Sequence, residues 1–187
     1  MQVIDLFEYP VKGLRGSKIC CASVNKRGLK MDRRWMIVDS ANSFLSQRQI
    51  PSLTQLLPSF QDSLMLENLA DSTSQEISLN DFDRVEEVEV WGQVVKARKG
   101  PEAANQWLTE YIGQPVSLIF MDEESIRPIR NNTEGEIVSF ADGYPLLLTG
   151  TASLEDLNSK LQTPIGIDRF RTNIHVSTIT PFEEEDW

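Results

Sequence analysis

The fold is decided by the stretch VIDLFEYPVKGLRGSKICCASVNKRGLKMDRRWMIVDSANSFLSQR, which occupies residues 3–48. Apolar segments recur in it at a spacing of roughly ten residues, and glycine, asparagine and serine cluster between them. The expected strands are an apolar run that begins at residue 3 and is ended by Pro10, and residues 18–24, 34–38 and 44–48. Short strands separated by turns at this spacing are typical of a β-barrel or a β-sandwich.

The middle of the chain adds strands and a first helix. Hairpins are expected from residues 64–67 with 76–79 and from residues 85–91 with 94–97. A single helical turn is expected to open at Pro51 and to end at Pro58. Apolar residues recur at helical spacing over 101–112, where Pro101 suits the first turn and Gly113 suits the position after the last. The sequence therefore predicts a helix over 101–112.

The C-terminal third is expected to continue this mixture. Residues 116–121 form a predicted buried strand and 122–136 a polar loop. Ser153 resembles a capping residue at the start of a second predicted helix, residues 153–161. We therefore predict an α+β fold with a mainly antiparallel, β-barrel-like architecture and two main helices.

Length and composition are those of a soluble globular protein. The chain has 187 residues, of which 40% are hydrophobic and 25% are charged. This length corresponds to one large domain or two small ones. No run approaches the roughly 20 apolar residues that span a bilayer, and the N-terminus lacks the pattern of a secretory signal. We expect a cytoplasmic protein without a membrane partner.

Cysteine and histidine usage excludes several kinds of site. Cys20 and Cys21 are adjacent, and an ordinary strand would point them to opposite faces, so they are not expected to bridge each other. Free cysteines indicate a reducing compartment. His175 is the single histidine, which argues against a Ser-His-Asp triad and against a zinc site without carboxylates. The sequence assigns neither catalytic residues nor metal ligands.

The net charge of −10 is unevenly spread along the chain. Residues 1–60 carry nine Lys or Arg and four Asp or Glu, whereas residues 61–187 carry nine and 24. An acidic chain is a poor candidate for binding nucleic acid, so we expect no such partner. The basic N-terminal third is suited to holding one small anion. The alternative is that the two parts lie on one surface and attract each other weakly.

Three basic residues next to turns are candidates for such an anion site. Lys12 precedes Gly13, Arg33 follows Asp32, and Arg171 lies shortly before a predicted strand. A phosphate is bound by several cationic donors together with backbone N–H groups of loops. The three residues would form a site if the fold brought their loops together, and otherwise each is a surface charge.

Nine short strings, in this order, resemble the MOSC proteins. They are YPVKGLRG at 9–16, DRRWM at 32–36, QRQ at 47–49, VEVWG at 88–92, ANQWL at 104–108, FADGYP at 140–145, ASL at 152–154, FRTNI at 170–174 and EEDW at 184–187. The resemblance is to the bacterial YcbX type, which is related to the mitochondrial amidoxime-reducing component. It implies an N-terminal β-barrel-like domain over 1–120 and the beginning of a truncated MOSC domain over 121–187.

The resemblance implies a molybdenum enzyme. Such proteins bind the molybdenum cofactor, a pterin with a phosphate and a metal-holding dithiolene, and reduce small N-hydroxylated substrates. Their electrons come from a redox partner or an iron–sulfur domain. The family's anchoring positions correspond to Lys12, Arg33, Ser153, Arg171 and Asn173, the last two from its FRxN motif.

Two departures from the family pattern matter for function. Gly13 stands where relatives often have Ser, and the chain ends at Trp187, before the segment whose cysteine ligates molybdenum in the family. We therefore expect the N-terminal portion of a molybdenum-cofactor-dependent oxidoreductase, inactive alone, with cofactor binding completed by the C-terminal part. The alternatives are a non-catalytic cofactor- or anion-binding module, such as a carrier or partner domain, and a structural module without a ligand.

Overall fold

Two sheets and one helix form the larger part of the molecule, here called the core region. The computed structural model describes residues 1–130 and 135–187, so residues 131–134 of the predicted polar loop lie outside the described residues. The first sheet has the order β10-β11-β12-β6-β2. Its strands are β2 (Val11–Lys12), β6 (Trp35–Asp39), β10 (Arg84–Val90), β11 (Gln93–Lys99) and β12 (Val116–Phe120). The second sheet consists of β7 (Leu56–Phe60), β8 (Ser63–Asn68) and β9 (Ser74–Ser78), in that order.

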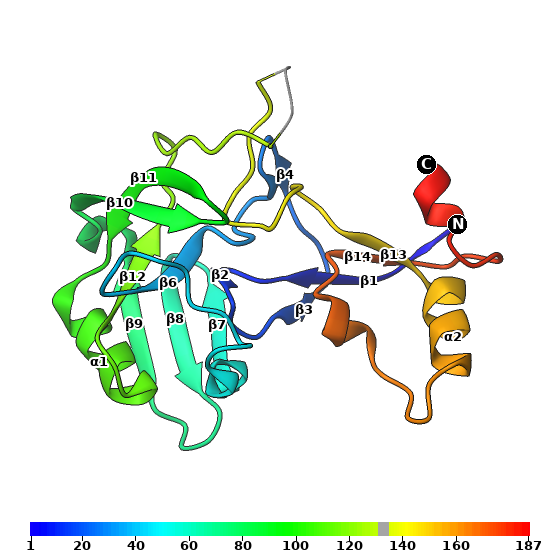
Figure 1. The fold of residues 1–187 in the computed structure, drawn as a ribbon, viewed down its shortest axis with the longest axis horizontal. Helices are drawn as coiled ribbons and strands as arrows, with labels where there is room; N and C mark the ends of the chain where they lie inside the picture. The colour runs from blue at the N-terminus through cyan, green and yellow to red at the C-terminus, as the bar shows by residue number, and fades with distance from the viewer. Residues whose placement is uncertain (131–134) are drawn as a thin grey trace.

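Helix α1 (Glu102–Ile112) closes the core region on one side (Figure 1). It buries Ala104, Asn105 and Leu108, and it ends at Gly113, whose φ of 81° is the left-handed conformation that glycine adopts readily. The core beneath it is aromatic as well as aliphatic. Trp35 is fully buried, and its ring stacks on Phe120 with the centroids 4.9 Å apart. The local signals that predict this helix therefore agree with its packing.

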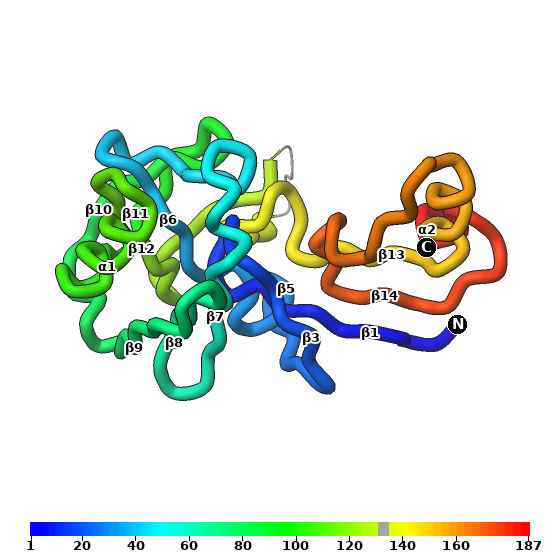
Figure 2. The backbone as a smooth tube through the Cα atoms, turned by 90° about the horizontal axis from the view of Figure 1, so that it is seen from below, coloured from blue at the N-terminus to red at the C-terminus, as the bar shows by residue number. Residues whose placement is uncertain are grey.

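A smaller part, here called the outer region, extends away from the core region (Figures 1 and 2). Its sheet has the order β13-β14-β1-β3, formed by β1 (Val3–Glu8), β3 (Ser17–Ile19), β13 (Leu148–Gly150) and β14 (Ile174–Val176). Helix α2 (Thr151–Ser159) and the 3-10 helix η4 (Glu183–Asp186) lie at its far end, where both chain termini also lie. Strand β1 runs from this end back to the core region, so it joins the two regions.

Short elements lie near the junction between the regions. They are the hairpin β4 (Val24–Asn25) with β5 (Gly28–Leu29) and the 3-10 helices η1 (Pro51–Gln55) and η3 (Ile167–Phe170). A further 3-10 helix, η2 (Leu79–Asp81), follows β9 within the core region, where Leu79 packs against the apolar interior. Gly28 has a φ of +103°, and a Cβ added there would lie 2.3 Å from the carbonyl oxygen of Pro145. Only glycine allows this close approach between the hairpin and the segment that leads to the outer region.

The predicted α+β fold, with mainly antiparallel strands and two helices, is confirmed. Most pairings are antiparallel, whereas β2–β6 and β13–β14 are parallel. The helices are Glu102–Ile112 and Thr151–Ser159, close to the predicted 101–112 and 153–161. The predicted hairpins form as β8–β9 and β10–β11.

Four local predictions of secondary structure are wrong. Ser153 does not cap the second helix, because that helix begins at Thr151 with Gly150 at its N-cap and has no side-chain cap. Residues 44–48 do not form a strand, because the pairing there is limited to one isolated bridge between Phe44 and Val38. Residues 18–24 divide between β3 and β4. Pro58 does not end a helical turn but lies within β7, the edge strand of its sheet, where a residue without an N–H is tolerated.

The proposed boundary at residue 120 stays a prediction. β1 pairs with β14, so one sheet contains residues from both sides of that boundary. Across residues 1–130 and 135–187, no helix combines the length and the apolar character needed to cross a membrane.

Candidate functional site

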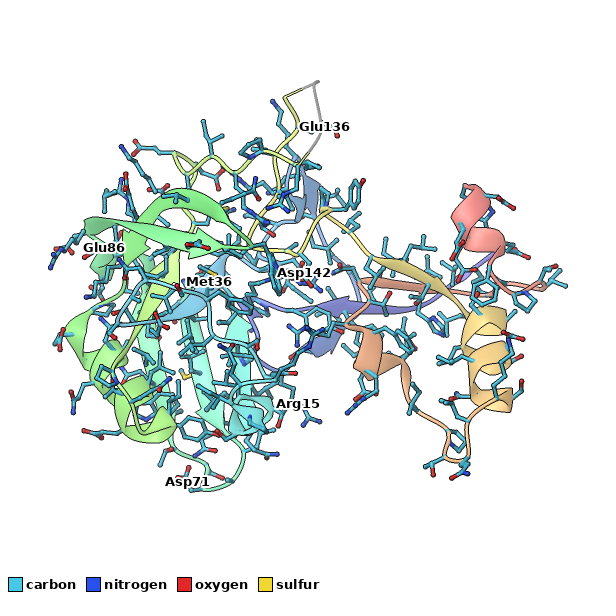
Figure 3. All side chains as sticks on the ribbon, in the orientation of Figure 1. Arg15, Met36, Asp71, Glu86, Glu136 and Asp142 are labelled. Atoms are coloured by element: carbon cyan, nitrogen blue, oxygen red, sulfur yellow. The ribbon has the colours of Figure 1, made fainter. Side chains whose placement is uncertain are left out.

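A cavity of about 1110 Å³ opens between the core region and the outer region. Its lining includes Lys12, Arg33, Arg171 and Asn173, four of the five predicted site residues. Asp142 lies at this junction, with Arg15 below it in the view of Figure 3. Six Lys or Arg residues line the cavity against two Asp: Lys12, Arg15, Arg33, Arg48, Arg169, Arg171, Asp142 and Asp168. A strongly positive cavity in a chain of net charge −10 is suited to an anion.

Lys12 approaches the cavity from β2, the strand of the core region that pairs in parallel with β6. Its side chain is only 6% exposed and forms an ion pair with Asp142. The ammonium lies over the rings of Phe44 and Trp91, at 4.7 and 5.4 Å from their centroids. Burial lowers the pKa of Lys12 to about 8, although Asp142 acts in the opposite direction. Lys12 is therefore a buried cation that loses its charge only slightly above neutral pH.

Asp142 connects Lys12 to an aromatic wall. Its Oδ1 accepts a hydrogen bond from Trp91 Nε1 at 2.9 Å as well as from Lys12 Nζ. Partial burial would raise the pKa of Asp142, but Lys12 and Trp91 outweigh it and the pKa lies below its usual value. The carboxylate is therefore ionised at neutral pH and acts as the counter-ion of Lys12 within the cavity.

Arg33 is held in place by a buried polar network. It follows Asp32 with a left-handed φ of 50°, and its Nη1 donates to Asp32 and to Asn173 Oδ1, the latter at 2.9 Å. Its Nη2 donates to the carbonyl of Arg171 at 2.8 Å. Asp32 is fully buried and also accepts from the backbone N–H of Tyr9. The network fixes the guanidinium of Arg33 at the cavity wall.

Asn173 connects the two regions through hydrogen bonds made by both polar atoms of its side chain. Its Oδ1 accepts from Arg33 and from the backbone N–H of Leu147, and its Nδ2 donates to Asp32 and to the carbonyl of Phe7. An amide offers one acceptor oxygen and two donor hydrogens, so this side chain is fully engaged. Asn173 therefore positions Arg33 and has no donor left over for a ligand.

Arg171 brings a cation from the outer region. It has a left-handed φ of 56°, and its Nη1 donates to the carbonyl of Leu14 at 2.6 Å. Its guanidinium lies 4.4 Å from the ring centroid of Tyr9, over which Arg33 also lies at 4.5 Å. Burial and the nearby Arg33 lower the pKa of Arg171 to about 10. Arg171 Nη2 is buried and has no hydrogen-bond partner among the described residues.

The fifth predicted residue, Ser153, does not line this cavity. It lies on α2, in the outer region, and its Oγ accepts a hydrogen bond from the backbone N–H of Phe182 at 2.8 Å. Its role as a cofactor contact stays a prediction from the resemblance. Cys20 and Cys21 do not line the cavity either.

Two residues that shape the site were not predicted. Asp142 belongs to the turn DGYP, whose composition indicated only a turn. Arg127 is buried and donates to the carbonyls of Ser139, Ala141 and Asp142, so it holds the segment that carries the carboxylate. Nothing in the local sequence distinguishes Arg127 from any other arginine of the polar loop.

Comparisons with known proteins agree with the motif pattern. The model of the MOSC N-terminal beta barrel domain matches residues 1–115. Mitochondrial amidoxime-reducing component 1 of Xenopus laevis is 28% identical, over 99% of this chain and 58% of its own length. Mitochondrial amidoxime reducing component 2 of Rattus norvegicus is also 28% identical, over 99% of this chain and 59% of its own.

A second kind of relative shares the same region. Molybdenum cofactor sulfurase of Oryza sativa subsp. japonica is 28% identical, over 96% of this chain and 24% of its own length. The chain thus spans somewhat more than half of the amidoxime-reducing relatives and about a quarter of the sulfurase. Because the domain model covers more than half of its residues, this chain belongs to the MOSC N-terminal beta barrel domain family.

Proposed function

We propose that the cavity binds the molybdenum cofactor and that the chain is the N-terminal portion of an oxidoreductase that reduces N-hydroxylated compounds. The observation that carries this proposal is the buried Arg171 Nη2, a donor without a partner among the described residues. A buried, unsatisfied donor costs about 1–3 kcal/mol, so it favours an anionic ligand that would satisfy it. The names of the amidoxime-reducing relatives supply the reaction class.

The residues present fit the phosphate of such a cofactor. Lys12 and Arg171 offer charged donors at the cavity, and Arg33 adds a third cation whose position is fixed by Asp32 and Asn173. Several cationic donors on one anion are the usual arrangement at phosphate sites. The rings of Trp91 and Phe44, which also line the cavity, offer apolar surface to a flat ring system.

The chemistry of the proposed reaction divides between the cofactor and the protein. When bound, the cofactor supplies two-electron redox chemistry at molybdenum. Lys12, Arg33 and Arg171 would bind and orient it. Neither cysteine lines the cavity, so the thiolate that a soft metal prefers would not come from this part of the protein. We therefore propose that the chain alone does not turn over substrate and that a redox partner or iron–sulfur domain provides electrons.

The same observation on the cysteines favours a second candidate function. A chain that offers a cationic cavity without a metal-ligating thiolate could serve as a non-catalytic cofactor- or anion-binding module. Both functions require the same anion site. They differ in turnover when the remainder of a MOSC domain is supplied.

Two further proposals concern the surroundings of the protein. The net charge of −10 supports the proposal that the chain does not bind nucleic acid. The two free cysteines support a reducing compartment such as the cytoplasm.

Calorimetric titration with inorganic pyrophosphate tests the anion site. We expect Arg171→Ala to weaken binding at least tenfold, about 1.4 kcal/mol, because it removes a cation and the unpartnered donor. Arg84→Ala is the matched control, since it removes one exposed cation outside the cavity. Equal affinities in the two variants would contradict the site. Arg171 also donates a hydrogen bond to the carbonyl of Leu14, so its loss can affect stability. The unfolding of each variant is therefore measured in parallel.

Cofactor content and turnover test the rest of the proposal. The chain is produced in cells that make the cofactor, and molybdenum and pterin per chain are measured for the native protein and Arg171→Ala. We expect the variant to retain less of both. With an artificial electron donor and a small amidoxime, we expect no reduction by the chain alone. Turnover that persists after both cysteines are replaced would contradict the thiolate argument.

A further inference from the structure

Cys20 and Cys21 lie between β3 and β4, outside the cavity described above. Because β3 ends at Ile19 and β4 begins at Val24, the alternation of an extended strand does not govern these two side chains. Cys20 Sγ lies 3.8 Å from Cys21 Sγ, within reach of an S–H···S hydrogen bond, and both cysteines are exposed and free. The expectation that they point to opposite faces is therefore wrong.

The two thiols are coupled to each other. The hydrogen bond with Cys20 and the charge of that residue raise the pKa of the Cys21 thiol. Once one proton is lost, the second is therefore held more tightly, as expected when two sulfurs share it. A ligand that replaces both thiol protons at once avoids the repulsion between two neighbouring thiolates. Because both cysteines are exposed, such a ligand can reach both sulfurs.

The surroundings of the pair decide which ligand fits. A structural zinc ion requires four ligands, usually Cys, His or carboxylate. Within residues 1–130 and 135–187, no group of three or more His, Cys, Asp or Glu side chains is placed to hold a metal ion. The ligand that suits this pair is therefore a soft element that needs only two sulfur ligands from the protein and already has its remaining substituent bound.

We propose that Cys20 and Cys21 form a chelating dithiol site for monosubstituted trivalent arsenicals, R–As=O. Each sulfur forms one As–S bond, and the two thiol protons leave with the arsenical oxygen as one water molecule. Arsenic stays trivalent and no electron is transferred, so the step needs no oxidant or reductant. After the first As–S bond, the second thiol is already close to the same arsenic atom, and chelation of this kind strengthens binding by about 10²–10⁴-fold.

Titration with phenylarsine oxide tests the site on the whole chain. We expect one equivalent to block both thiols against a thiol-reactive dye and to add one phenylarsenic unit to the intact mass. We expect Cys20→Ser and Cys21→Ser each to weaken binding at least 100-fold, because either change leaves a single As–S bond. Both positions are exposed, so neither serine is expected to disturb folding.

Three outcomes would overturn the proposal. The first is that a single-serine variant binds phenylarsine oxide as tightly as the native chain. The second is that one equivalent leaves a thiol free in the native chain. The third is that arsenic joins two chains, which size-exclusion chromatography would show as a dimer. Release of the adduct by a small dithiol, but not by a monothiol at the same concentration, is the expected sign of chelation.

Discussion

The core region is held together by a continuous apolar interior, whereas the outer region is a narrow sheet with one helix beside it. In the core region, α1 buries Leu108 completely against strands whose own side chains are buried. In the outer region, α2 buries only Ala152 among its residues. The cavity lies between these unequal walls, with Lys12 on the core side and Arg171 on the outer side. The difference teaches that the cation site is built from two unequal walls. The wall from the core region is firmly packed, whereas the wall from the outer region buries few apolar side chains of its own.

The largest expected effect contrasts the two helices directly. Leu108→Ala should lower the free energy of unfolding by about 2–5 kcal/mol, because Leu108 is fully buried. Leu157→Ala, on the half-buried face of α2, should lower the free energy of unfolding by about 1 kcal/mol or less. Leu157 is only partly buried, so folding removes less of its apolar surface from water. Urea unfolding measures both. Equal losses would remove the distinction between the regions.

A substitution at the contact between the regions should have a smaller effect. Gly28→Ala should destabilise the protein by more than about 1 kcal/mol, because of its positive φ and the nearby carbonyl of Pro145. Gly143→Ala is the control, since a Cβ at Gly143 would meet nothing within 4 Å. Thermal unfolding compares them. A Gly28→Ala protein as stable as the control would show that the hairpin is free to move away from the outer region.

The pH dependence of anion binding should separate the two walls. Lys12, with a pKa of about 8, is charged at pH 7 and largely neutral at pH 9, so the affinity for an anion should fall as the pH rises through 8. Arg171 stays charged over this range, because a guanidinium remains protonated in proteins, so its contribution should not change between pH 7 and 9. We expect about a tenfold loss of affinity as Lys12 loses its charge. Inorganic sulfate is the probe, because its charge does not change over this range.

The variant Lys12→Gln isolates the contribution of Lys12 to this loss. It should bind sulfate more weakly at pH 7 and show no loss of affinity between pH 7 and 9, because Arg171 stays charged over that range. A step near pH 8 that survives in this variant would assign the titration to another group and contradict the role of Lys12.

The smallest expected effect is a shift of the pH at which affinity is lost through deprotonation of Lys12. Asp142 favours the charged form of Lys12, so Asp142→Asn should move the midpoint of the loss to a pH below 8. Asp168→Asn is the matched control, because Asp168 lines the cavity but forms no ion pair with Lys12. Sulfate titrations at closely spaced pH values measure the midpoint. An unchanged midpoint in Asp142→Asn would contradict the coupling.

Local features of the fold were predictable from sequence, and long-range features were not. The helix ending at Gly113 follows from neighbouring residues, because periodicity and the glycine act within a few residues. The strand expected at 44–48 fails because only tertiary pairing decides whether Phe44 continues a ladder. Likewise, nothing near Ile174 indicates that β14 pairs with β1.

The cavity was predictable only through its charges and the resemblance. Lys12, Arg33 and Arg171 could be proposed as partners of one anion, since like charges gather where an anion compensates them. The burial of Asp32 and the position of Tyr9 beneath two guanidinium groups arise from folding and have no local signature. The cationic residues of the site could therefore be predicted from sequence, whereas the groups that position them could not.

The pairing of β1 with β14 has a consequence for synthesis of the chain on the ribosome. The side chain of Asn173 donates a hydrogen bond to the carbonyl of Phe7 across 166 residues, so β1 is made long before the strand with which it pairs. At a translation rate of about 5–20 residues per second, this wait is about 8–33 s. During it, the edge of β1 that later pairs with β14 has no strand to bind, and Val3 and Ile4 lie on that strand. The nascent chain is thus open to chaperones, and to wrong pairing with other nascent chains, until translation passes Val176.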